Sequence, residues 1–299
     1  MRQKTRFGLK CFGCRHNYRP ESVNFRPEKL NTPAMAAQFI SFDIGLRALS
    51  VNDMARALRP GIRLELLPEV REAVEANRAY LQQFVDEEQT AIYGVNTGFG
   101  SLCDIAISKS ELRQLQENLV RSHAAGVGEN CPRVVGRLML LLKIHALAQG
   151  YSGIRVETLQ RLVDHFNYDL APVIPRQGSL GASGDLAPLA HLALPLLGEG
   201  QVEYQGQVRP TAEVYQTLGW EPLKLGAKEG LALLNGTQFM LAYGILAADQ
   251  FRRLMKLAER ILALSFDAFA CKLEPLHVLL HHVRPHPGQV ETASSVLSL

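Results

Sequence analysis

The segment GSLGASGDLAPLAHLALPLLGEG, residues 178–200, places a cluster of Gly, Ser and Ala directly before an apolar run. Glycine is favoured where the backbone must bend tightly or be approached closely. The three small residues Ala182-Ser183-Gly184 stand just ahead of a helix start predicted near Leu186, which Asp185 is placed to cap. Two interpretations remain open: a turn that leads into a helix, or a backbone segment that itself reacts.

The second interpretation follows from the chemistry of Ala182-Ser183-Gly184. In a tightly bent loop, the Gly184 nitrogen can attack the Ala182 carbonyl carbon and close a five-membered ring. Loss of water gives an imidazolone, and loss of the Ser183 hydroxyl leaves an exocyclic methylidene. The positive end of the following helix would favour electron flow into this ring. The segment therefore predicts an electrophile built without an added cofactor.

Bulk composition indicates an ordinary globular protein. The chain has 299 residues, 47% hydrophobic content and a formal net charge of +3, which argues against nucleic acid as the main partner. No run reaches the roughly 18 uninterrupted apolar residues of a membrane span. The most apolar run, residues 138–148, carries Lys143 and His145 and predicts a buried helix.

The cysteines predict a reducing, cytoplasmic location. They are few, odd in number and scattered, at Cys11, Cys14, Cys103, Cys131 and Cys271. A disulfide scaffold is therefore not expected. Cys11 and Cys14 form half of a zinc site with no second pair at ligand spacing, so we predict no metal.

Apolar spacing predicts a mainly α fold of long helices packed as a bundle. Helices are expected within residues 67–88, 109–126, 133–150 and 156–172, and a longest one over about 230–270. That last helix would present an apolar face. Its members are Leu246, Leu254, Leu257, Ile261 and Leu264. Residues 201–210 predict a hairpin and residues 90–95 a short extended piece. Residues 1–34 are basic and predict a disordered extension.

Three further segments combine polar groups with small residues. Tyr93 lies in IYGVNTGFG, residues 92–100, which is either a connection or a loop that carries Tyr93 into a cleft. His123 lies near the end of a predicted helix, which Gly126 could terminate. It is either a hydrogen-bonded structural residue or part of a functional site. Asn235-Gly236 interrupts an apolar run, so it predicts a helix cap or kink, or a site whose buried amide must find partners.

These motifs resemble, in order, those of the aromatic amino acid ammonia-lyase family. The resemblance rests on YGVNTGFG, NLVRSHAAGVGE, GSLGASGDLAPLAH, LLNGTQ and RPHPGQ, and it covers roughly residues 36–299. His123 in its SHA context makes the chain most similar to the branch that acts on histidine. NTGFG in place of TTGYG argues against the aminomutase branch. Other enzymes of the family, and a helical assembly protein without activity, are the alternatives.

The resemblance implies a set of roles. Ala182, Ser183 and Gly184 would form the 4-methylidene-imidazol-5-one (MIO) group, with Asp185 beside it and no external cofactor. Tyr93 would remove the β-proton, and His123 would contact the substrate. Asn235 would support the electrophile and the substrate carboxylate. The implied reaction is loss of ammonia from L-histidine to give urocanate, the first step of histidine degradation, in a homotetramer.

The resemblance also implies a domain organisation. Residues 35–229 would form the MIO-bearing region, and residues 230–299 would begin a central helical bundle. Family members continue through a further helical half that supplies an arginine, a glutamate and another tyrosine to the site. We therefore expect this chain alone to be weakly active or inactive.

Overall fold

The computed structural model describes residues 39–87, 92, 94–95, 97, 109–180 and 184–299. Contacts divide the chain into residues 1–37 and 38–299. The described part of the second unit is mainly α-helical, as the apolar spacing predicts.

The expected helices form close to their predicted bounds. They are α2 (Pro68–Glu87), α3 (Lys109–His123), α4 (Arg133–Ala148) and α5 (Val156–Asn167). The predicted hairpin is β6 (Gln201–Tyr204) and β7 (Gln207–Pro210), which pair antiparallel. Of the predicted extended piece, residues 92, 94 and 95 are described, and Gly94 and Val95 lie in a turn.

Further elements complete the fold. Shorter helices are α1 (Val51–Ala57), α6 (Leu186–Ala193), α7 (Thr211–Leu218), α10 (Val278–His282) and α11 (Pro287–Ser298), and two 3₁₀ helices cover Leu194–Leu197 and Glu274–Leu276. Strands β1 (Ile40–Ile44) and β2 (Ile62–Leu66) pair in parallel, with Ile40 opposite Ile62. Strands β3 (Val127–Asn130) and β5 (Pro175–Gln177) pair antiparallel, and β4 (Ala171–Pro172) pairs with β6.

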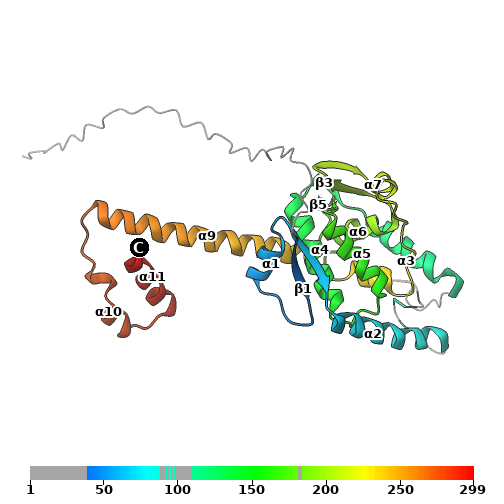
Figure 1. Cartoon of the computed structure of the whole chain (residues 1–299), viewed down its shortest axis with the longest axis horizontal. Coiled ribbons are helices and arrows are strands. Elements are labelled where there is room, and N and C mark those ends of the chain that lie inside the picture. The colour runs from blue at the N-terminus through cyan, green and yellow to red at the C-terminus, as the bar shows by residue number, and fades with distance from the viewer. Residues whose placement is uncertain (1–38, 88–91, 93, 96, 98–108, 181–183) are drawn as a thin grey trace, which may run out of the picture. The chain divides into compact units, whose positions relative to one another are not determined.

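The core is centred on α4, which packs against α2, α5, α6 and α9 (Figure 1). Its apolar run is buried around its circumference, which confirms the sequence prediction. The buried residues include Leu138, Met139, Leu140, Leu141 and Ile144. A helix with no polar face must be enclosed by other elements, so α4 fixes the positions of the helices that surround it.

The predicted longest helix is broken into α8 (Glu229–Leu234) and α9 (Gln238–Ala268). The longest helix therefore begins at Gln238 and not near residue 230, and the predicted helix cap at Asn235-Gly236 accounts for the difference. The break falls at Asn235-Gly236, where Gly236 has a φ of +143°. A right-handed helix cannot pass through that conformation. Beyond its first turns, α9 exposes much of its apolar surface, and α11 packs on it.

The segment Glu229–Ala268 is long and apolar enough to cross a membrane by length and composition, with a mean hydropathy of 1.4 in its most apolar window. One third of that window, 33%, is buried inside the protein. Core helices of globular proteins pass the same test. Here the segment also carries Arg252, Arg253 and Lys256 in the middle of α9.

Candidate active site

The start of α6 and the linker between α8 and α9 meet at Gly184. Gly184 has a φ of +122°, and a Cβ placed on it would lie 2.5 Å from the Gly236 carbonyl oxygen. The next amide, that of Asp185, donates a hydrogen bond to the same oxygen at 2.9 Å. Both the backbone conformation and the close approach require glycine at this position.

Asp185 does not cap the helix that it precedes, which corrects the sequence prediction. It stands at the N-cap position of α6 but makes no side-chain cap bond there. Its carboxylate, fully buried, instead accepts hydrogen bonds from the amides of Phe239 at 2.8 Å and Met240 at 3.0 Å. Ser179 Oγ donates to the other oxygen at 2.6 Å. Asp185 therefore caps α9, because that helix presents its unpaired N–H groups and positive end to the carboxylate.

Asn235 lies at the C-cap of α8, as the cap interpretation predicts. Its side chain is exposed, so the expectation of a buried amide is wrong. The buried interactions belong to its backbone: the Asn235 amide donates to Leu231 O at 3.0 Å, and the Asn235 carbonyl accepts from Lys143 Nζ at 2.6 Å. The side-chain amide of Asn235 therefore faces away from the core.

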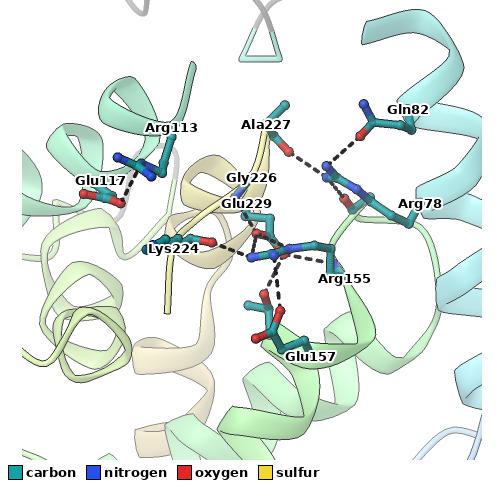
Figure 2. A network of polar contacts seen from close by, with 12 residues as sticks. Arg78, Gln82, Arg113, Glu117, Arg155, Glu157, Lys224, Gly226, Ala227 and Glu229 are labelled. Atoms are coloured by element: carbon teal, nitrogen blue, oxygen red, sulfur yellow. Dashed lines mark hydrogen bonds and ion pairs between the residues drawn. The ribbon is translucent and has the colours of Figure 1, made fainter. Parts of the chain in front are cut away.

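The other end of α8 is fixed by a buried ion pair (Figure 2). Glu229 is fully buried and accepts from Arg155 Nη2 at 2.9 Å, Thr158 Oγ1 at 2.6 Å and the Gly226 amide at 2.6 Å. Burial alone would raise the pKa of Glu229, but these hydrogen bonds, with that of Arg155 foremost, outweigh it and lower the pKa. The six-residue helix α8 is therefore held at Glu229 and at Asn235.

His123 ends α3 and is half-buried. Its Nδ1 lies 2.8 Å from Leu119 O and 3.2 Å from Ser122 Oγ. Because a carbonyl oxygen only accepts, Nδ1 carries the proton, and in the neutral ring Nε2 is the acceptor. The segment after His123 is attached to α6, since the Gly126 amide donates to His191 Nε2 at 3.0 Å. Gly126 lies beyond the end of α3 and is required for this close approach: a Cβ there would lie 2.9 Å from His191 Nε2.

The structure thus brings Gly184, Asp185 and Asn235 together, and it ties the segment after His123 to the same helix α6. Tyr93, Ala182 and Ser183 lie outside the described residues. Among the residues that the structure does describe, no cluster of His, Cys, Asp or Glu could hold a metal ion. A cavity of about 690 Å³ near Arg260 and Leu273 lies at the far end of α9 from Asp185.

Sequence reasoning missed Lys143, His191 and Glu229 as supports of the site. A signal existed for Lys143, because a lysine within the run LMLLLKIHALA must find a polar partner once the helix is buried. For His191 and Glu229 the sequence does not identify the partners Gly126 and Arg155, which lie 65 and 74 residues away along the chain.

The sequence profile described as "Aromatic amino acid lyase" matches residues 49–299. The chain belongs to this family. Curated relatives of this chain include the histidine ammonia-lyases of Gloeobacter violaceus, 46% identical over 252 residues, and Deinococcus radiodurans, 46% identical over 250. Each alignment covers 84% of this chain, and 49% and 48% of the respective relatives. The chain therefore spans about half the length of the curated relatives that it matches.

Solved structures agree with this family membership. A histidine ammonia-lyase from Trypanosoma cruzi superposes with a TM-score of 0.80 at 39% identity, covering 86% of this chain and 50% of that one. A tyrosine aminomutase from Streptomyces globisporus superposes with a TM-score of 0.81 at 35% identity, covering 87% and 49%. The fold is thus shared by lyases and aminomutases of the family and does not by itself select a reaction.

Proposed function

We propose that the protein eliminates ammonia from L-histidine to give urocanate. The observation that carries the proposal is the fit of Gly184, whose φ of +122° and contact with Gly236 O leave room for no side chain. That is the residue whose nitrogen would attack the Ala182 carbonyl carbon, and the names of the curated relatives supply histidine as the substrate.

The residues present fit an MIO group made from Ala182, Ser183 and Gly184. Gly184 provides an unhindered nitrogen, and the buried carboxylate of Asp185 fixes the chain immediately after it to α9. Once formed, the group would supply an electron sink that makes loss of the substrate amino group feasible. Removal of the β-proton and binding of the substrate are assigned to side chains of the protein.

Three side chains are assigned to the substrate. Tyr93 is the base for the β-proton, a role that a deprotonated phenol can fill. His123 contacts the substrate through Nε2, because Nδ1 is engaged by Leu119 O. The exposed amide of Asn235 binds the substrate carboxylate, since its backbone is fixed by Lys143 while its side chain is free to face a ligand. Tyr93 keeps its role by resemblance alone.

The whole protein is proposed to act as a cytoplasmic homotetramer, as the family resemblance implies. Because the chain spans about half the length of its relatives, we expect the chain alone to turn histidine over weakly or not at all.

Product analysis with three substrates tests the proposal. The purified chain is incubated for long periods with histidine, tyrosine or phenylalanine, and products are identified by mass spectrometry. We expect any product to be urocanate from histidine, and none from a Ser183→Ala variant, which lacks the hydroxyl that must leave. Coumarate or cinnamate as the main product would instead indicate another enzyme of the family. Rapid turnover of histidine would refute the expectation that the chain alone is weakly active or inactive.

A further inference from the structure

Lys143 is a buried lysine in the middle of α4. Its side chain is 1% exposed, and it lies in a helix whose neighbouring residues are apolar. Its ammonium donates to the backbone carbonyl of Asn235 at 2.6 Å, a contact between residues 92 positions apart in the chain. A short hydrogen bond thus joins the centre of the core to the linker between α8 and α9.

The burial of Lys143 is costly by itself. Desolvation lowers the pKa of its ammonium to about 7, and among the described residues no carboxylate pairs with it. An apolar side chain of similar length would fill the same space without that cost. Among the described residues, the directed contact that distinguishes a lysine here from an apolar side chain is its hydrogen bond to the Asn235 carbonyl.

That contact belongs to a backbone feature that we call the shelf, Asn235 and Gly236. The first carbonyl of the shelf accepts from Lys143, and the second accepts from the amide of Asp185 at 2.9 Å. The second carbonyl is also the atom that a Cβ on Gly184 would approach to 2.5 Å. Displacing the shelf would therefore release the backbone that follows the Gly184 nitrogen.

We propose that Lys143 is a positioning residue: by holding the Asn235 carbonyl, it keeps the shelf against Gly184 and so promotes cyclisation of Ala182-Ser183-Gly184. This inference rests on the proposed function. In the reaction the Gly184 nitrogen bonds to the Ala182 carbonyl carbon, and the carbonyl oxygen leaves as water together with the amide hydrogens of Gly184 and Ser183. The Ser183 hydroxyl leaves with the Ser183 α-hydrogen as a second water, so no oxidant is needed.

Two readouts on the whole chain test the role of Lys143. The first is the rate at which the peptide containing residues 182–184 loses two waters, followed by mass spectrometry during cell-free synthesis. The second is hydrogen exchange of the Asp185, Phe239 and Met240 amides. In Lys143→Met we expect cyclisation about tenfold slower, equivalent to about 1.4 kcal/mol in the barrier, and faster exchange at these amides.

Two further variants separate positioning from general stability. Tyr215→Phe removes a buried hydrogen bond to His165 at 2.7 Å, in a part of the core without contact to the shelf, and should leave both readouts as in the parent. Lys143→Gln keeps a hydrogen-bond donor on a shorter side chain. It replaces Lys143→Met in both measurements if that variant does not fold. We expect Lys143→Met to melt within a few degrees of the parent while cyclising slowly.

The outcomes are distinct for the inference and for the proposed function. Parent-like cyclisation and exchange in the Lys143 variants would overturn the positioning role. A parent chain that never loses two waters would overturn the proposed electrophile. In that case the exchange of the Asp185 amide still decides whether Lys143 holds the shelf.

Discussion

At the scale of single residues, the geometry at Gly184 depends on two backbone carbonyls. Those of Asn235 and Gly236 are held by Lys143 and by the Asp185 amide, and the second of them excludes any side chain from position 184. The sequence alone predicts a reactive role for Gly184 and its small neighbours, because the ring-closing chemistry involves only adjacent residues. It does not predict the shelf, because the partners are brought together by packing of α4, α6 and α8.

The carboxylate of Asp185 gives a prediction at the same scale. Asp185→Ala leaves the Phe239 and Met240 amides without their acceptor and should lower the free energy of unfolding by about 1–3 kcal/mol. Urea denaturation measures the change. The matched control is Asp43→Ala, whose carboxylate is exposed and which should stay within about 0.5 kcal/mol of the parent. Equal losses in both variants would contradict the assignment of Asp185 as the cap of α9.

At the scale of elements, hydrophobic periodicity predicts the long helices because each is either amphipathic or, like α4, apolar over a continuous run. It misses the parallel pair β1 and β2, whose strands are five residues each and joined through α1. Periodicity also does not separate α8 from α9, because the apolar spacing continues across Asn235-Gly236 although the helix is interrupted there. Short strands and breaks depend on distant partners, so a local pattern carries little information about them.

A cluster between α5 and α7 should make the protein sensitive to acid. His165 is buried, lies 2.7 Å from the Tyr215 hydroxyl and stacks on Trp220. Burial, aided by the nearby Arg161, lowers the pKa of His165 from 6.5 to about 3. The unfolded chain therefore binds a proton that the folded chain does not between these values, and stability falls as the pH drops from 6.5 toward 3.

The size of this effect follows from the linkage. Between pH 7 and pH 5 the His165 contribution should cost about 2 kcal/mol of stability. Denaturation curves at both pH values measure it, and His165→Gln should lose most of that difference while remaining folded at pH 7. A variant with the same pH dependence as the parent would show that His165 is not the group responsible.

At the scale of the whole molecule, α9 presents an apolar surface that the described chain does not cover. Leu254 is 63% exposed and Leu264 is 69% exposed, and both belong to the apolar face that the sequence predicts for this helix. Large exposed apolar patches are typical of association surfaces. Family membership agrees with this, because the matched relatives extend over about twice the length covered here.

The exposed face of α9 predicts self-association of this chain. Sedimentation equilibrium should show mass above that of one chain at micromolar concentration. Leu257→Glu together with Ile261→Glu, at 51% and 55% exposed positions, should shift the chain toward monomer. Lys256→Glu, which changes charge without removing apolar surface, is the control. A parent chain that stays monomeric at every concentration would contradict this use of α9.

Ala182, Ser183 and Gly184 are proposed to condense into an electrophile in this member of the aromatic amino acid lyase family. The most direct measurement is the mass of the proteolytic peptide that spans these residues in the purified parent chain. We expect a mass lower by two water molecules in the parent, and in Ser183→Ala the unmodified mass after allowance for the substitution. A parent peptide with its full unmodified mass would contradict this proposal.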